Sequence, residues 1–171
     1  MQPDRGIEDL EQFLAERGRP LLRTAVLLAG SKEGGEDLLQ EALVRLLRQW
    51  RSIAGSPEGY LRQTLYHLAF DGWRRERRRR ERLRLLQASE RGPLADTSSQ
   101  VDLRDAMARL LRQLPARQRA VIVARYWEER SESETAEILG CSVGTVKSTT
   151  SRGLAKMREL SESWDSAEHI R

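Results

Sequence analysis

The sequence has few of the residues that build disulfide-bonded or metal-stabilised folds. Its 171 residues include one cysteine, Cys141, and two histidines, His67 and His169. A single cysteine excludes an intramolecular disulfide and a cysteine-based zinc site, and two histidines are too few for a metal centre. We therefore expect no metal site and no cofactor.

Long apolar runs are also absent. No stretch approaches the ~20 consecutive apolar residues that a membrane-spanning helix needs, and no apolar segment follows a basic start as in a secretory signal. Aromatic residues make up 5% of the chain and charged residues 33%, which is typical of a small helical protein with modest cores. The net charge of +4 identifies no partner by itself, so the distribution of charge matters more. We expect a cytoplasmic protein.

The patterns that carry enzymatic chemistry are missing too. The chain shows no nucleophile and base at a suitable spacing, and no glycine-rich loop that would bind phosphates. The nearest acidic group, formed by Glu36, Asp37 and Glu41, lies on a predicted helix without the further ligands that a metal would need. A solvated helix face accounts for it locally, and we expect a protein that is not an enzyme.

The most informative segment that is present is Ser131 to Met157. Ser131 and Glu134 form an S-x-x-E capping box, which predicts the start of a helix. Gly140 supplies a left-handed cap at the end of that helix, and Ser142 caps a second one. The segment therefore predicts two helices joined by a tight turn.

The second of these helices has an apolar and a polar stripe. The apolar stripe recurs every three or four residues and consists of Val143, Val146, Thr150, Leu154 and Met157. The opposite stripe is small, polar and positive: Thr145, Ser148, Thr149, Arg152 and Lys156, with Lys147 at its flank. Since no Asp or Glu occurs from Ser142 to Arg158, this face can lie in a DNA major groove. An ordinary helical hairpin with a solvated face is the alternative.

A long helix predicted from Glu58 to Gln87 changes character midway. Its first half is mostly apolar, with a polar strip formed by Gln63, Thr64, His67, Asp71 and Arg74. After Trp73 the positive residues dominate against only Glu76 and Glu81: Arg74, Arg75, Arg77, Arg78, Arg79, Arg80, Arg82 and Arg84. Like charges on neighbouring turns repel each other, and a polyanion relieves that repulsion. This run favours a nucleic-acid contact, although a solvated helix end would have the same composition.

Three further helices are predicted in the first half of the chain. A short one covers Glu8 to Arg17 and ends at Gly18, and a second follows Pro20. The third covers Glu36 to Trp50. Its expected core stripe is Leu39, Ala42, Leu43, Leu46, Leu47 and Trp50, and its expected outer face is Asp37, Gln40, Glu41, Val44, Arg45 and Arg48.

The chain divides at residues 87–101, where Gly92, Pro93 and a Thr97 to Ser99 cluster interrupt all periodicity. We expect an all-α fold with two helical domains, residues 1–86 and 102–160, joined by a flexible linker and followed by a polar tail, residues 161–171. Pro115 is expected in the first turn of a helix of the second domain.

Four segments, taken in order, resemble bacterial RNA polymerase sigma factors of the extracytoplasmic-function class. Their amino-acid sequences are most similar to those of its short actinobacterial-type members. They are EDLLQEALVRLLRQW, YLRQTLYHLAFDGWRR, LPARQRAVIVARYWEE and ETAEILGCSVGTVKSTTSRGLAKMR. The resemblance covers roughly Leu10 to Leu160. It implies that the two domains are sigma domains 2 and 4, and that the protein binds core RNA polymerase and directs promoter-specific initiation.

The resemblance also implies roles for residues of the first domain. A surface that grips the clamp helices of the largest polymerase subunit matches Asp37, Gln40, Glu41, Arg45 and Arg48. The region that recognises and melts the minus-ten element, with its adjacent backbone, matches His67, Asp71, Trp73, Arg74, Arg75, Arg77 and Arg78. The family usually has Asn where His67 stands, so base preference there is open. Tyr66, Phe70 and Trp73 can stack on bases, but an aromatic stripe on one helix face is more often core.

In the second domain, the resemblance implies that the helix entering the minus-thirty-five major groove carries Thr145, Lys147, Ser148, Thr149, Arg152 and Lys156. Arg152 is the candidate for reading guanine, Lys147 for a phosphate contact. Many family members have Arg in place of Thr149. The implied partners are promoter DNA, the polymerase clamp helices and flap, and an anti-sigma factor as a natural inhibitor. The rival functions are a free-standing helix-turn-helix regulator and, with less support, a nucleic-acid-processing enzyme.

Overall fold

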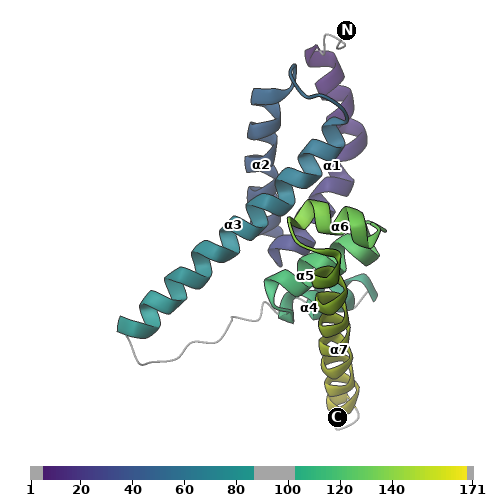
Figure 1. Cartoon of the computed structure of the whole chain (residues 1–171). Helices are drawn as coiled ribbons and strands as arrows, with labels where there is room; N and C mark the ends of the chain where they lie inside the picture. Colours follow the sequence, from purple (N-terminus) through teal and green to yellow (C-terminus); the bar gives the residue numbers. More distant parts are fainter. Residues whose placement is uncertain (1–5, 87–102, 169–171) are drawn as a thin grey trace.

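The computed structural model describes residues 6–86 and 103–168, and all regular structure within those two stretches is helical (Figure 1). The expected linker, residues 87–101, lies outside the described residues, as do both ends of the chain. The helices form two groups, which we name the first lobe (α1 to α3) and the second lobe (α4 to α7).

The first lobe consists of α1 (Ile7–Ala29), α2 (Lys32–Gln49) and α3 (Pro57–Leu86). The first two helices pack along each other, and the first half of α3 crosses them, while its second half projects away from the rest of the molecule (Figure 1). The core of this lobe is built from apolar side chains that are fully buried: Leu21, Ala25, Leu28, Ala42, Leu46, Leu61, Leu65 and Tyr66.

Helix α1 is continuous, so the prediction that Gly18 ends a first helix is wrong. Both Gly18 and Pro20 lie inside α1. Proline removes one backbone hydrogen bond from a helix interior, but Leu21, Ala25 and Leu28 immediately after it are fully buried. We infer that packing of this buried stripe outweighs the local penalties, as tertiary contacts commonly do.

A close approach of two backbones sets the crossing of α1 and α2. A Cβ atom added to Gly35 would lie 2.5 Å from Cα of Val26 and 2.6 Å from its backbone nitrogen. Only glycine allows this contact, because the obstacle is main chain that cannot rotate aside. Helix α2 begins at Lys32, earlier than the predicted start at Glu36, and the side chain of its N-cap Ser31 accepts a hydrogen bond from the Gly34 amide (3.1 Å).

The second lobe consists of α4 (Leu103–Gln113), α5 (Ala116–Ile122), the π-helical turn η1 (Val123–Trp127), α6 (Glu132–Leu139) and α7 (Val143–Glu168). Pro115 is the N-cap of α5, next to its predicted place. Helices α5 and α6 both pack against α7. The backbone of α7 stays helical to Glu168, beyond the start of the expected tail.

The predicted caps of the helix-turn-helix are present. The Ser131 side chain accepts from the Glu134 amide (3.1 Å) while the Glu134 carboxylate accepts from the Ser131 amide (2.8 Å). These hydrogen bonds lower the pKa of Glu134, and the bond from the Ser131 backbone amide has the largest effect. Gly140 ends α6 at φ 59°, and Ser142 accepts from the Thr145 amide (3.1 Å). The turn chemistry read from the sequence is therefore confirmed.

The two lobes touch each other. A single cluster of buried apolar residues runs from α1 and α3 of the first lobe into α4, α5 and η1 of the second. Its members in the second lobe include Leu111, Leu114, Ala120, Ile122, Val123 and Ala124. The described parts of the chain therefore form one packed body from which the end of α3 and the end of α7 project (Figure 1).

We predict that Gly35→Ala lowers the free energy of unfolding by ~1–3 kcal/mol, because the new methyl group meets the α1 backbone. The matched control is Gly18→Ala, where a Cβ atom would meet nothing within 4 Å. This control should gain ~0.5–1 kcal/mol from the better helix propensity of alanine. Chemical unfolding followed by circular dichroism measures both, and equal stabilities for the two variants would contradict the crossing described above.

Candidate nucleic-acid interface

The outer face of α7 carries most of the residues predicted to enter a major groove. Lys147, Ser148, Arg152 and Lys156 are exposed, and Thr145 is half-buried. The side chain of Arg152 lies along its own helix, where Nε donates to the Ser148 carbonyl (3.2 Å). This helix follows a tight turn and has its capped N-terminal end in the open, which is the geometry of a recognition helix.

Thr149 corrects the sequence-based prediction. Its side chain is only 3% exposed, so it belongs to the packed face of α7 and not to the outer one. It follows Val146 by three residues and precedes Gly153 by four, and both of these are buried. The exposed position that the prediction missed is Ser151, which lies beside Arg152.

The lysine residues of this face form only weak, exposed ion pairs. Lys147 lies 3.6 Å from the Glu132 carboxylate, and Lys156 lies 2.8 Å from that of Glu159. Exposed ion pairs of this kind contribute ~0–1 kcal/mol, so phosphate groups can replace the carboxylates at little cost. The face is therefore available to an anionic partner.

The polar strip of α3 is exposed at His67, Asp71 and Arg74. The aromatic stripe beside it is not. Tyr66 is fully buried, and Trp73 is half-buried with its ring edge-on to Phe70 at a centroid distance of 5.0 Å. In this arrangement the core interpretation of the three aromatic residues is the correct one, although Trp73 lies at the edge of that core.

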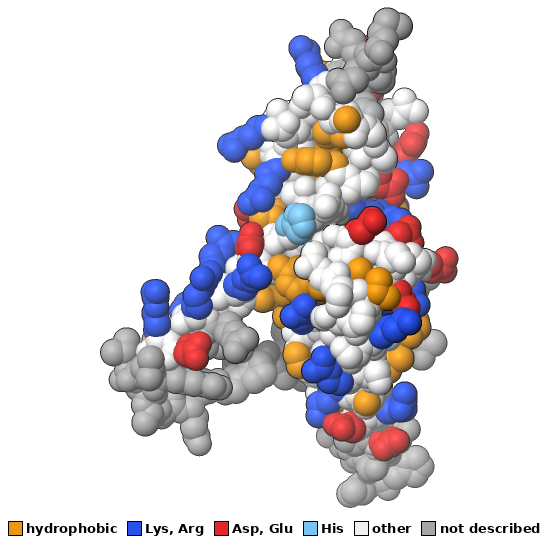
Figure 2. All heavy atoms as spheres, in the orientation of Figure 1, with side chains coloured by type: hydrophobic (Ala, Val, Ile, Leu, Met, Phe, Trp, Pro, Cys, Tyr) orange, Lys and Arg blue, Asp and Glu red, His pale blue; other side chains and the backbone are white. Residues whose placement is uncertain are grey.

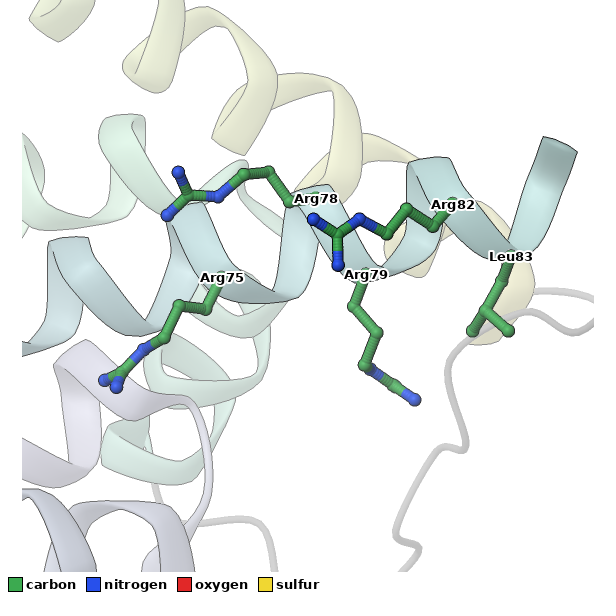
Figure 3. A pocket seen from close by; sticks show the side chains of 5 residues that line it. All are labelled: Arg75, Arg78, Arg79, Arg82 and Leu83. Atoms are coloured by element: carbon green, nitrogen blue, oxygen red, sulfur yellow. The ribbon is translucent and has the colours of Figure 1, made fainter.

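The projecting end of α3 forms an arginine-rich arm. Arg75, Arg78, Arg79 and Arg82 line an open groove with Leu83, and Figure 3 shows their side chains spreading from successive turns. Figure 2 shows positive side chains along this arm and again along α7. Arg79 bonds Glu76 (2.8 Å), which raises the pKa of Arg79. The side chain of Arg77, also predicted to contact DNA, is outside the described part.

A different kind of surface covers α2. All five residues predicted to bind polymerase are exposed: Asp37, Gln40, Glu41, Arg45 and Arg48. Val44 and Leu47 lie among them with exposed fractions of 47% and 54%, so the prediction that Leu47 belongs to the core is wrong. Leu46, which was also predicted to be core, is fully buried. An apolar centre with a charged rim is the usual composition of a protein-binding surface.

A charge cluster that sequence patterns did not reveal lies between the lobes. The Glu128 carboxylate accepts from the Thr24 hydroxyl (3.0 Å), from Arg62 and from the Tyr66 hydroxyl (3.3 Å). The Glu128 side chain is 1% exposed, and its partners come from α1 and α3. Burial, followed by the charge of Glu128, raises the pKa of Tyr66.

A second cation is buried where the lobes meet. Arg119 of α5 places its guanidinium 5.6 Å from the centre of the Trp73 ring, and burial lowers its pKa to about 10. It therefore stays charged at neutral pH. A Cβ atom on Gly30 would lie 2.5 Å from the Arg119 guanidinium, so this glycine leaves room for it.

Within residues 6–86 and 103–168, no group of three or more His, Cys, Asp or Glu side chains could hold a metal ion. None of the helices in that part of the chain is long and apolar enough to cross a membrane.

Comparison with known proteins places both lobes. Residues 14–79 match Sigma-70 region 2, and residues 104–157 match Sigma-70, region 4. The chain is 37% identical to the RNA polymerase sigma-E factor of Streptomyces avermitilis over 92% of this chain and 87% of that one. It is 30% identical to the ECF RNA polymerase sigma factor SigM of Mycobacterium tuberculosis over 88% and 76%.

Among solved structures, the chain is similar in fold to the sigma factor RpoE in its complex with the anti-sigma factor NepR from Bartonella quintana. The TM-score is 0.68 at 24% identity, covering 91% of this chain and 98% of that one. The matched regions, their order and the helix-turn-helix agree with the sequence-based expectation. The chain therefore belongs to the sigma-70 family of RNA polymerase sigma factors, in its extracytoplasmic-function class, whose members are non-catalytic subunits that direct promoter-specific transcription initiation.

Proposed function

We propose that the exposed surfaces of the two lobes divide the work of initiation between them. The α2 face binds core RNA polymerase, the α3 strip and arm bind the minus-ten element with its flanking backbone, and the outer face of α7 reads the minus-thirty-five element. The observation that carries this proposal is the exposure of all five predicted polymerase-binding residues around an apolar centre on one helix, apart from both basic surfaces.

The α2 face suits a protein partner better than DNA. Asp37 and Glu41 would repel phosphate, and Glu41 already pairs with Arg45 at 3.0 Å. Val44 and Leu47 supply apolar area that a helical partner would bury. In the family resemblance, the corresponding partner is the pair of clamp helices in the largest polymerase subunit.

The α3 surface suits DNA backbone and unpaired bases. Arg75, Arg78, Arg79 and Arg82 offer guanidinium groups to phosphates, each of which releases counterions on binding. His67 and Asp71, exposed one turn apart, provide donors and an acceptor for a base taken out of the stack. Nucleotide addition itself belongs to the polymerase, and this chain contributes binding energy for strand separation.

On the outer face of α7, Arg152 is the residue proposed to read a base. A guanidinium can bond both O6 and N7 of guanine, a contact worth ~1–3 kcal/mol of discrimination. Lys147, Ser148 and Lys156 are proposed for phosphate or flanking contacts. Thr149 is not proposed again, because it is buried, and Ser151 takes its place as a candidate.

The solved relatives suggest one class of partner beyond core polymerase and promoter DNA. The fold resembles sigma factors solved with the anti-sigma factor NepR and with the cytosolic domain of CnrY. We propose that an inhibitor protein of this class binds the present chain too, and that it acts in the cytoplasm, near the nucleoid when bound to polymerase. A free-standing helix-turn-helix regulator would leave the α2 face without a partner.

Reversing the charges of the α2 face tests the polymerase surface. Asp37→Arg combined with Glu41→Arg should abolish co-elution with core polymerase in gel filtration, since both carboxylates are exposed there, and should leave DNA affinity of the free chain intact. The control, Glu11→Arg with Glu16→Arg, makes the same charge change on the exposed side of α1. Co-elution that survives the α2 reversal would place the polymerase surface elsewhere.

Truncating the proposed base-reading residue tests the second lobe. Arg152→Ala should reduce transcription from cognate promoters ~10-fold or more through loss of one bidentate contact, with core binding unchanged. Arg158→Ala is the control, because six residues place it ~120° away around the same helix. In vitro transcription from a promoter library measures both variants, and an equal loss of core binding in Arg152→Ala would mean that the lobes are misassigned.

A further inference from the structure

The carboxylate of Glu128 belongs to the second lobe, but the groups that bond it belong to the first. Thr24 comes from α1, and Arg62 and Tyr66 come from successive turns of α3. One oxygen accepts from Thr24 and Arg62, and the other from Tyr66. This cluster therefore exists only while the lobes are together.

The backbone conformation around Glu128 directs its side chain toward the first lobe. The π-helical turn η1 ends with the Glu128 amide bonded to the Val123 carbonyl (3.0 Å). The next residue, Glu129, has φ 54°, a left-handed conformation that costs a non-glycine residue ~1–2 kcal/mol. A strained turn placed directly after the buried carboxylate indicates that its position matters to the fold.

Within the first lobe, Arg62 is already positioned by a carboxylate of the same lobe. Glu58 bonds Arg62 (2.6 Å) and is itself 3.3 Å from Arg17, so Arg62 keeps a carboxylate partner within its own lobe. Burial works to lower the pKa of Arg62, but the bonds and charges of Glu58 and Glu128 outweigh it and raise that pKa. The lobes can thus separate without leaving Arg62 unpaired, and the Glu128 carboxylate would then be hydrated by solvent.

Such a contact is suited to reversible closure. A buried ion pair gains attraction but loses hydration, so its net contribution to stability is small even though removing one partner is costly. A weak net gain with strict geometry fixes how the lobes dock without making the docking permanent. Arg119 stacked over Trp73 adds a second point of contact between the lobes.

The closed arrangement conflicts with promoter binding. The two promoter elements are named for positions minus thirty-five and minus ten, so they lie about 25 base pairs apart. This separation is ~85 Å at 3.4 Å per base pair. Lobes that share one hydrophobic cluster cannot reach both elements at once. Trp73, proposed to contact DNA beside the minus-ten element, is also half covered in this form.

We propose that Glu128, with Arg62, Tyr66 and Thr24, is a latch that holds the free chain closed and prevents it from engaging both promoter elements until polymerase binding separates the lobes. The inhibitory consequence rests on the proposed function, whereas the latch itself is a property of the free chain. Because polymerase binding must also supply the free energy that separates the lobes, the apparent affinity for polymerase is lower than that of a chain without the latch.

The test measures the distance between the lobes in the full-length free chain. Nitroxide labels are placed at Ala15→Cys in α1 and Glu137→Cys in α6, both exposed, in a Cys141→Ser background. Glu128→Gln keeps the shape and removes the charge. Its matched control is Glu129→Gln, the same change at the exposed neighbouring residue. Tyr66→Phe, which removes only one bond to Glu128, is the milder second variant.

We expect one short distance in the unsubstituted chain and in Glu129→Gln, and a broad distribution reaching longer distances in Glu128→Gln, with Tyr66→Phe between them. Helix content by circular dichroism should be unchanged. Apparent affinity for core polymerase should rise on the order of tenfold in Glu128→Gln.

Identical distance distributions in all variants would overturn the latch. Opening in Glu128→Gln without any gain in polymerase affinity would overturn its inhibitory role. Failure of the unsubstituted chain and of Glu128→Gln to bind polymerase at all would instead refute the proposed function, because the distance measurement does not depend on polymerase.

Discussion

A buried carboxylate shared between two halves of the chain determines how this sigma factor is arranged. Glu128 has no place in the interior of either lobe alone, since its donors and its backbone come from opposite lobes. Around it, apolar residues of α1, α3, α5 and η1 close the same junction. The carboxylate specifies the docking geometry, and the apolar contacts supply most of the attraction.

This junction leaves the functional surfaces unequally exposed. The α2 face, which we propose binds polymerase, and the outer face of α7 remain exposed while the lobes are together. The aromatic edge of α3 is partly covered by the second lobe through Arg119 and Trp73. Under the proposed function, docking through α2 precedes separation of the lobes, and separation precedes full use of α3.

The sequence predicted what is decided locally and missed what is decided at a distance. The Ser131 and Glu134 capping box, Gly140 and the outer face of α2 follow from residues within a few positions of one another, and the structure contains them. Thr149 was misplaced because threonine is equally plausible on either side of a helix. Leu47 was misplaced because periodicity cannot distinguish a core stripe from exposed apolar residues beside it. Glu128 gave no signal at all, since Arg62 and Thr24 are 66 and 104 residues away along the chain.

The central claim is that one chain uses two lobes that touch when free and separate on a promoter. Single-molecule energy transfer between a donor on α1 and an acceptor on α6 tests it most directly, in the free chain and after addition of core polymerase and promoter DNA. The account predicts high transfer efficiency in the free chain and near-zero efficiency in the promoter complex, where the two elements lie ~85 Å apart. High efficiency that persists in a transcriptionally active complex would contradict it.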